Sequence, residues 1–488
     1  MNVLADLPIS QTDWNQTPLS VQAVVMVLWQ EPQTLKQHMV TLQNQVTILQ
    51  AEVAKLREQV NKNSHNSSKP PSSDPPHQPT HPKREASGKK QGGQQGHAGK
   101  GRKLVAPGRV SRVVVSKPIT CQGCGALLLG EDPHPQRHQV SELPRLEPEI
   151  IEYQVHRLAC GVCGMPNQAA WPEEMPRGSF GERVQALIGS LGGRFGVSQR
   201  DMQALLETVF HVEIGLGSLP AQEKRLSQAL EHPVQAAQAY VQQQAVVNLD
   251  ETSWHEQDRN GWLWVGTTPT VTVFRLGQGR GAHDCQQVVG QDYAGIVGSD
   301  RYSAYTWLEP QRRQVCWAYL KRDFQAWVER GGASKTVGRL LLLEVKRFFG
   351  LWYRVRDGTL SRIDFQVAMH PIRKEVRCLL HVGTFIKQRT TRRTCQNILK
   401  LEQALWTFVE QEGVEPTNNA AERALRRGVI WRRRSFGTQS EAGSRFVERI
   451  LTVVTTLRQQ KRDVLDYLTA AGKARTLGQT APSLLPAV

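Results

Sequence analysis

Apolar residues near the start of the chain recur at alternating spacings of four and three residues, which is the heptad pattern of a coiled coil. The heptad positions are Leu35, Met39, Leu42, Val46, Leu49, Val53, Leu56 and Val60. Valine at three of the four a positions, with leucine at every d position, favours a parallel two-stranded coiled coil. The alternative is an amphipathic helix docked on its own protein. We therefore expect a homodimer held together by this segment, preceded by a short helix around 21–29.

Four short apolar runs in the middle of the chain have the length and composition of buried strands. They are residues 245–249, 262–266, 271–276 and 295–299, with a turn at 267–269. Asp250 ends the first run, and Asp300 follows the last run 50 residues later. We expect these two carboxylates to meet at one edge of a sheet.

Two other blocks carry apolar residues at helical spacing. Residues 180–244 form three predicted helices with glycine-rich breaks, which is typical of either a helix-turn-helix DNA module or a helical spacer. Residues 313–324 indicate a further strand and a basic turn, and 336–411 indicate several helices. Because this second block separates Asp300 from the next acidic candidate, we interpret it as an insertion.

Composition and charge narrow the class of protein. At 488 residues the chain is too long for one core and should hold two to four domains. Lys and Arg outnumber Asp and Glu by 61 to 44, a net charge of +17, which favours nucleic acid over a membrane as partner. A basic protein without such a partner is the alternative. No run of 18 apolar residues and no signal peptide is evident, so we expect a cytoplasmic protein.

A segment rich in Pro, Ser, Gly, Gln and Lys follows the heptads and cannot bury a core, so it is a predicted linker. Between Lys83 and Lys117 it holds ten Lys or Arg residues and a single acid. Such a run is either a solvated tail or a phosphate-tracking segment. Its candidate DNA contacts are Lys89, Lys90, Arg102 and Lys103.

Four of the eight cysteines stand in two matched pairs, Cys121 with Cys124 and Cys160 with Cys163. Each pair is followed by glycine, which allows backbone amides to turn toward the thiolates. Four thiolates from two such turns predict one structural Zn²⁺ site in a zinc ribbon. The alternating stretch 145–160 is expected to supply the ribbon's strands. A redox dithiol is the alternative.

A third acidic residue, Glu422, lies on a predicted helix within TNNAAERALRR. Together with Asp250 and Asp300 it would complete a site for two Mg²⁺ or Mn²⁺ ions, because hard cations prefer oxygen ligands. Each acid taken singly is as readily a turn former or a helix cap, and Asn419 with Glu422 has the spacing of a capping box. Glu251 is a possible substitute ligand, although its side chain on a strand should face away from that of Asp250.

Arginine is concentrated on and after the same predicted helix, where its planar fork suits phosphate. Asn419 and Arg426 lie on the helical face of Glu422 and could orient it or contact phosphate. Trp431 could stack on a base or anchor the core. The candidate DNA contacts here are Arg426, Arg427, Arg432, Arg433 and Arg434.

Seven motifs in order give the chain a family resemblance: NSSKPPSSD, GGQQGH, the paired CxxC knuckles, LDET, SDRYSAY, CWAYLKRDF and NNAAERALR. The chain resembles the insertion-sequence-66 family of bacterial DDE transposases. The resemblance implies a multidomain α/β protein with a ribonuclease-H-like catalytic core and an all-helical insertion. By motif it places the DDE triad on Asp250, Asp300 and Glu422.

The resemblance also implies an activity and its partners. These are binding to the terminal inverted repeats, cleavage at the element's ends, and strand transfer into target DNA, with accessory proteins of the same element as further candidates. Arg301 in SDRYSAY is a supporting candidate. Tyr319 stands where the family usually has His, and Gln95 where it usually has Pro. The Tyr319 departure raises the question of whether this copy is active.

The predicted division of the chain follows from these patterns. It comprises the coiled coil (1–62), linker (63–118), zinc ribbon (119–168), helical and DNA-binding candidate segment (175–240), first catalytic part (241–325), helical insertion (326–412), second catalytic part (413–475) and tail (476–488). Two rival functions remain open, namely a non-catalytic zinc-containing DNA-binding dimer and a plain metal nuclease.

Overall fold

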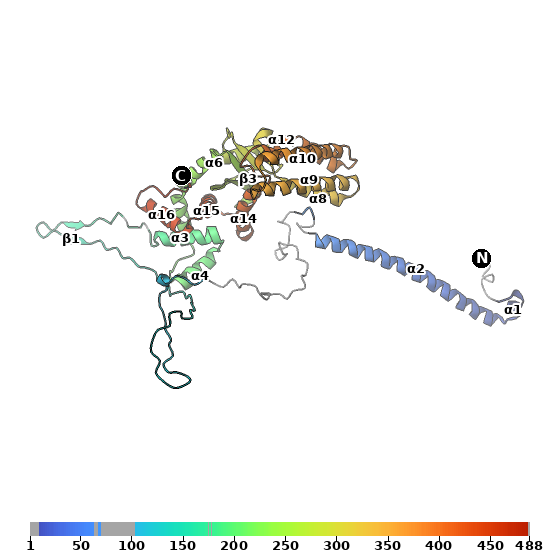
Figure 1. Ribbon diagram of the computed structural model, residues 1–488, viewed down its shortest axis with the longest axis horizontal. Helices are drawn as coiled ribbons and strands as arrows, with labels where there is room; N and C mark the ends of the chain where they lie inside the picture. The colour runs from blue at the N-terminus through green and yellow to red at the C-terminus, as the bar shows by residue number, and fades with distance from the viewer. Residues whose placement is uncertain (1–8, 63–66, 70–102, 174, 177, 487–488) are drawn as a thin grey trace. The chain divides into compact units, whose positions relative to one another are not determined.

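The computed structural model describes residues 9–62, 67–69, 103–173, 175–176 and 178–486 (Figure 1). It divides the chain into two compact units. One unit combines Met1–Pro82 with Tyr319–Leu399, and the other combines Lys83–Ala318 with Lys400–Val488. Residues 319–399 therefore interrupt the second unit in sequence.

Within the described residues, the second unit contains a five-stranded mixed sheet in the order β5-β4-β3-β6-β7. The strands are β3 Val246–Glu256, β4 Arg259–Thr267, β5 Thr272–Gly277, β6 Ile296–Ser299 and β7 Arg313–Val315. β3, β4 and β5 form an antiparallel meander, whereas β6 is parallel to β3 and β7 is parallel to β6. All four apolar runs are confirmed as strands. The structure adds a helix, α7 Ala282–Val289, that the sequence analysis did not predict.

Helices cover both faces of this sheet. On one face Val247 and Leu249 of β3 share a core with residues of α6 Glu231–Gln242 and α7. On the other face Leu263 and Val265 of β4 pack against α14 Asn419–Ser435 and α15 Glu441–Gln459. The alternation of side chains along each strand allows both faces to bury apolar groups. A sheet covered on both sides follows.

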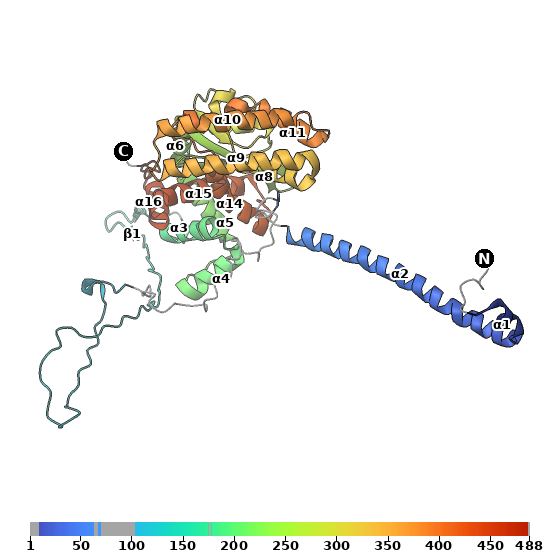
Figure 2. The same ribbon diagram turned by 45° about the vertical axis from the view of Figure 1, so that its right-hand side comes forward.

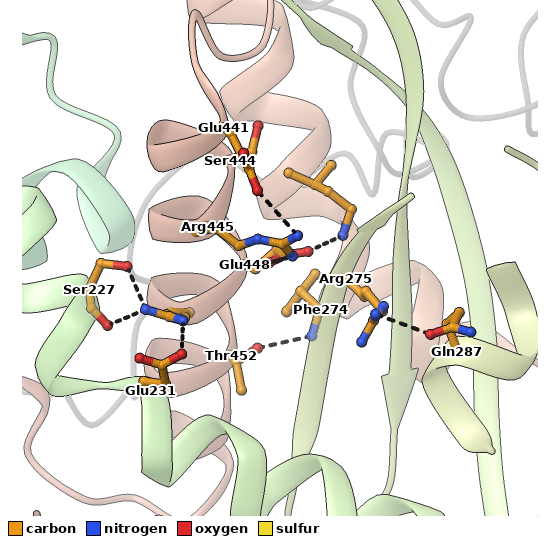
Figure 3. A network of polar contacts seen from close by, with 12 residues as sticks. Ser227, Glu231, Phe274, Arg275, Gln287, Glu441, Ser444, Arg445, Glu448 and Thr452 are labelled. Atoms are coloured by element: carbon orange, nitrogen blue, oxygen red, sulfur yellow. Dashed lines mark hydrogen bonds and ion pairs between the residues drawn. The ribbon is translucent and has the colours of Figure 1, made fainter. Parts of the chain in front are cut away.

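The edge strand β5 is closed by side chains of α15, as Figure 3 shows for Phe274 and Thr452. Every second N–H group of β5, from Thr272 to Leu276, donates to α15: to Thr456 Oγ1 at 3.1 Å, Thr452 Oγ1 at 2.9 Å and Glu448 Oε1 at 2.6 Å. Two strand residues span about 6.8 Å and four helical residues about 6 Å, so the two repeats match. These backbone N–H groups of β5 are therefore not free to pair with a strand of another molecule.

The helices predicted over 180–244 are confirmed as α3 Glu182–Ser190 with a π-helical turn Leu191–Phe195, α4 Gln199–Phe210, α5 Ser218–Ala229 and α6. In Figure 2, α3 and α5 lie beside α15 and α16 Val464–Thr476. Ala186 and Leu226 share one core with Ile450 and Leu468. A Cβ at Gly193 would stand 2.2 Å from Ile450 Cγ1, so the glycine-rich break permits this close packing.

The block at 319–399 is helical, and the helices predicted over 336–411 are confirmed. Its helices are α8 Trp317–Arg330, α9 Gly332–Arg356, α10 Arg362–Gly383 and α11 Arg389–Leu399. The basic turn predicted after the 313–315 strand is wrong, because α8 begins at Trp317. The chain then returns to the second unit through α12 Glu402–Leu405 and α13 Thr407–Glu410.

The heptads lie within one long helix, α2 Leu19–Asn61, preceded by α1 Gln11–Gln16. Residues 21–29 are helical, as predicted, but they belong to this long helix and do not form a short helix of their own. Heptad side chains such as Leu42 and Leu49 are each 58% exposed in the single chain. Across the described residues, none of the helices has the length and apolar character needed to cross a bilayer.

We expect Thr452→Val to lower the free energy of unfolding by about 1–3 kcal/mol, because the isosteric change leaves the buried N–H of Phe274 without an acceptor. Thermal melts of the full chain measure this. Thr455→Val is the matched control, because the buried Oγ1 of Thr455 has no hydrogen-bond partner among the described residues. Equal destabilisation by both variants would contradict the role of Thr452 in closing the edge.

Candidate active site

Asp250 lies in the middle of β3, and the prediction that it ends the strand is wrong. The apolar run stops at Leu249, but the antiparallel ladder with β4 continues from Asp250 opposite Val265 to Glu256 opposite Arg259. Pairing with β4 provides hydrogen bonds for the backbone groups of these more polar residues, so the strand continues beyond the apolar run.

Asp300 follows β6 directly, as predicted. β3 and β6 are parallel, with Asn248 opposite Gly298. Asp250 and Asp300 each follow their member of that pair by two residues. Since neighbouring strands are about 4.8 Å apart, this register sets the two acids side by side at one level of the sheet.

Glu422 lies in the first turn of α14. The residue before that helix, Asn418, hydrogen-bonds to β3. Asn418 donates from Nδ2 to the Leu249 carbonyl at 2.6 Å and accepts from Asn248 Nδ2 at 2.9 Å. Asn418, and not Asn419, is the N-cap residue, and it makes no side-chain cap bond, so the capping box considered for Asn419 is absent. Asn419 is exposed. The amide that positions Glu422 is therefore that of its neighbour Asn418.

Neighbouring acidic residues affect the pKa of Asp250. Burial raises the pKa of Asp250 well above its usual value, and the negative charges of Glu251, Glu422 and Asp300 raise it further. The N–H of Glu251, which donates to Asp250 Oδ1 at 3.0 Å, opposes this increase in pKa. Mutually repelling carboxylates of this kind gain stability from a bound cation.

Two observations describe how the carboxylates are oriented. Glu422 Oε1 is buried and has no hydrogen-bond partner among the described residues. Asp300 Oδ1 instead accepts the N–H of Tyr302 at 2.9 Å. As the side chains stand, no group of three or more His, Cys, Asp or Glu residues in the described part of the chain converges closely enough to hold a metal ion.

Glu251 has partners of its own, distinct from those of Asp250. Tyr305 donates to Glu251 Oε2 at 2.6 Å, and Arg280 donates to Glu251 Oε1 at 2.9 Å. The Arg280 guanidinium also lies 3.8 Å from the ring centroid of Tyr302. Burial raises the pKa of Glu251, whereas the hydrogen bond from Tyr305 lowers it. Glu251 thus joins β3 to the segment after β6.

Arg313 supports the backbone of Asp300 from inside the protein. It is 1% exposed, donates to Ser299 Oγ at 3.1 Å, and donates to the Asp300 carbonyl at 2.6 Å. Burial lowers the pKa of Arg313, and the charge of Asp300 raises it. No role was predicted from the sequence for Arg313 or Arg280. A basic residue in a polar stretch of sequence gives no local sign that it will be buried. Their tyrosine partners, in contrast, belong to the SDRYSAY motif, which the sequence did single out.

At least three of the five arginines predicted to contact DNA on α14 hydrogen-bond within the protein. Arg432 donates to Thr252 Oγ1 at 3.0 Å and to the Ser253 carbonyl at 2.6 Å. Arg427 and Arg434 donate to backbone carbonyls of Arg194 and Gly196. Arg426 and Arg433 are exposed.

The remaining candidates lie in different settings. Arg301 is half-buried next to Asp300, and its charge lowers the pKa of Arg313. Tyr319, in the other unit, lies in the first turn of α8 with the Arg322 guanidinium 4.2 Å from its ring centroid. Lys103 is exposed, and Lys89, Lys90 and Arg102 lie outside the described residues.

The two cysteine knuckles form locally. Gly125 and Gly164 have φ of 75° and 71°, as the glycine after each knuckle predicted, and each donates its N–H to the carbonyl of the first cysteine. Backbone N–H groups lower the pKa of Cys121 and Cys160, which favours the thiolate. The four sulfurs do not form one group in this structure.

The strands predicted for this region over 145–160 are largely wrong, because only Arg157–Ala159 (β1) is a strand there. It pairs antiparallel with Pro166–Gln168 (β2) across the second knuckle. Both strands are exposed, so no buried face selects a longer pairing from the alternating sequence.

The chain is similar to known protein families and to individual proteins. A family model described as "Transposase IS66 family" matches residues 177–445, more than half of the chain, and a family of unknown function matches 16–103. Two relatives come from Sinorhizobium fredii (strain NBRC 101917 / NGR234), both named as uncharacterised proteins. Protein y4hP is 26% identical over 73% of this chain and 70% of its own length. Protein y4qI is 27% identical over 42% of each.

We expect Asp250→Asn to raise the melting temperature at pH 7 in EDTA, with the gain shrinking toward pH 4. The pKa of Asp250 is raised in the folded state above about 3.9 in the unfolded state, so folded wild type binds more protons. Wild type therefore loses stability as the pH rises above about 4 toward that raised pKa, whereas the amide does not. Melts across this pH range measure the difference. The exposed Asp258→Asn is the control, and a variant less stable than wild type at pH 7 would contradict the expectation.

Proposed function

This chain belongs to the IS66 family of transposases, and we propose that it binds the ends of its insertion sequence and catalyses metal-dependent DNA cleavage and strand transfer. Asp250, Asp300 and Glu422 are the proposed catalytic residues. The observation that carries the proposal is the β3–β6 register, which sets Asp250 level with Asp300, together with the charges of Asp300 and Glu422 acting on Asp250.

The strand order and directions support a ribonuclease-H-like core. Three antiparallel strands are followed by two parallel ones, and the first strand in sequence, β3, is at the centre of the sheet. Helices on both faces match the same architecture. We propose that residues 319–399 are the helical insertion of that core.

The acids fit a pair of divalent cations by their chemistry. The unpartnered buried Glu422 Oε1 and the repulsion among carboxylates around Asp250 both favour positive charge at this place. When bound, two Mg²⁺ or Mn²⁺ ions would supply the positive charge that activates an attacking oxygen and stabilises a leaving one. Asp250, Asp300 and Glu422 would hold these ions.

The other residues of the chain position these acids. Asn418 fixes the start of α14 against β3, and Arg313 fixes the backbone of Asp300. Glu251, held by Arg280 and Tyr305, links β3 to the segment after β6. The nucleophiles in the proposed reaction are water and then the 3′-hydroxyl of the DNA, so no side chain forms a covalent intermediate.

A non-catalytic DNA-binding dimer is the second candidate function. The observation that favours it is Tyr319, whose aromatic ring packs with Arg322 at the position where the family usually has His. Such a protein would bind DNA without cutting it in Mg²⁺ or Mn²⁺.

We expect Asp250→Asn, Asp300→Asn and Glu422→Gln each to reduce strand transfer of an end-containing oligonucleotide more than about a hundredfold. The basis is that changes to groups that merely support a metal ligand already cost about 10–100-fold. DNA binding in a gel shift should persist, because an amide is nearly isosteric with a carboxylate.

Asp258→Asn, in the exposed β3–β4 turn, is the matched control and should transfer strands like wild type. Glu251→Gln does not serve this purpose, because Glu251 is 8% exposed and pairs with Arg280. Near-normal transfer by any one triad variant removes that residue from the site. A wild type that binds ends but never cuts supports the second candidate, and Tyr319→His then tests restoration.

We further propose that α2 forms a parallel homodimeric coiled coil that brings two element ends together. Its exposed heptad side chains form an apolar stripe, and burying this stripe against an identical helix would remove it from water. The stripe's regular spacing of four and three residues fits a second copy of the same helix.

Leu42→Lys combined with Leu49→Lys should give a monomer by light scattering, because two charges in the apolar seam lose their hydration on pairing. Thr41→Lys combined with Ile48→Lys adds the same charge to neighbouring positions outside the a and d seam and should stay dimeric. A dimeric Leu42 and Leu49 double variant would locate the assembly elsewhere.

We also propose one structural Zn²⁺ bound by Cys121, Cys124, Cys160 and Cys163. The lowered pKa of the first thiol in each knuckle supports this, since the thiolate is the ligand. Elemental analysis should give about one zinc per chain, lost in Cys160→Ser and retained in Cys378→Ser, an exposed cysteine of α10. Zinc that survives Cys160→Ser would contradict the site.

A further inference from the structure

The helical block at 319–399 carries most of the protein's excess positive charge. It contains 17 Lys or Arg against six Asp or Glu, a net +11 of the chain's +17 in a sixth of its length. Self-repulsion on this scale destabilises a compact domain unless a polyanion offsets it. The sequence analysis assigned DNA contacts to the linker and to α14, and none to this block.

The charge is concentrated on one side of α9. Lys335, Arg339 and Lys346 are exposed and, at 100° per residue, lie within roughly 40° of one another around the helix. The buried side chains of α9, including Leu341 and Phe348, lie on the opposite side. The outer side of α9 is therefore a continuous basic stripe.

Three acidic residues of the block, on α9 and near the helix ends that follow it, bond to groups other than Lys335, Arg339 and Lys346. The one acid of α9, Glu344, is buried and accepts from Arg347 at 2.9 Å. Asp357 and Asp364 accept hydrogen bonds from Thr359 and from Ser361 where helices end and begin. A merely solvated helix face usually mixes both signs of charge, whereas the exposed charges of α9 are all positive.

A second basic segment lies close to the first turn of α9, on the side of that helix where Ser334 is buried. Ser334 in α9 hydrogen-bonds to Thr391 in α11 at 2.9 Å and to Gln388 at 3.3 Å. The first turns of α9 and α11 are thus adjacent. Exposed cations next to this junction on the α11 side are Lys387, Arg389 and Arg393.

We propose that this basic face, formed by α9 and the start of α11, holds duplex DNA through its phosphates without reading sequence. From Lys335 to Lys346 it extends roughly 16 Å along α9, about five base pairs of duplex. Besides the cations, the face presents Leu343, Gly350 and Tyr353, which lack the paired donors and acceptors that recognise a base edge. The inference rests on the proposed function, since it assigns a second DNA surface to the same enzyme.

The test measures binding of the full-length protein to a fluorescein-labelled duplex of scrambled sequence, by anisotropy at several KCl concentrations. Lys335→Gln, Arg339→Gln and Lys346→Gln combined should weaken binding about tenfold and lower the slope of log K against log salt by about two to three. Arg389→Gln with Arg393→Gln should lower that slope by about one to two. Circular dichroism verifies that each variant is folded.

The matched control removes the same number of charges from the other unit: Arg458→Gln, Lys461→Gln and Lys473→Gln, all exposed, should change affinity less than about twofold. An unchanged salt slope in the α9 variant overturns the inference, and so does a loss confined to end-containing duplexes. Failure here is separable from failure of the proposed function. Normal strand transfer by the triad variants overturns catalysis alone, whereas a wild type that binds no duplex overturns both.

Discussion

Parallel pairing of β3 with β6 joins two segments about 50 residues apart, and closing so long a loop costs conformational entropy. Burial of Val247, Leu249 and Val297 in one core offsets that cost. The same pairing fixes the level of Asp250 against Asp300, so the register that buries the core also assembles the candidate site. A shift by one residue would bury the wrong face of the strand and separate the two acids.

Around this pairing, buried polar residues hold the elements that carry the site. Asn418 ties α14 to β3, Arg313 ties the Asp300 backbone to the core, and Glu251 with Arg280 joins β3 to the segment after β6. Each of these groups is hydrogen-bonded, as buried polar groups must be to avoid a desolvation penalty. In contrast, Glu422 Oε1 is buried without a partner, and Asp250 is surrounded by like charges. Two of the three proposed catalytic acids, Asp250 and Glu422, thus carry a local cost that a bound cation would offset.

Positive charge in this protein serves two different ends. On α14, Arg427, Arg432 and Arg434 bind carbonyl and hydroxyl oxygens of the chain and stabilise the fold. On α9 the cations project from the side opposite the core, and the only acid of that helix is buried. The density of arginine along the sequence therefore did not distinguish structural cations from those available to a polyanion. The burial and hydrogen bonds of each side chain in the structure distinguish them.

The sequence by itself determined the elements whose pattern is local. Apolar spacing predicted the helices of 180–244 and of 336–411 and the four strands near the site, and motif order predicted the family. Apolar periodicity is enough to predict these elements because each buries one face, and the apolar residues of that face lie close together in the sequence. Only the tertiary structure decided the end of β3, the N-cap role of Asn418, the helix directly after β7, and the hydrogen bonds made by Arg280 and Arg313. Each depends on hydrogen bonds between residues distant in sequence, and a polar side chain carries no local sign of whether water or a buried partner will satisfy it.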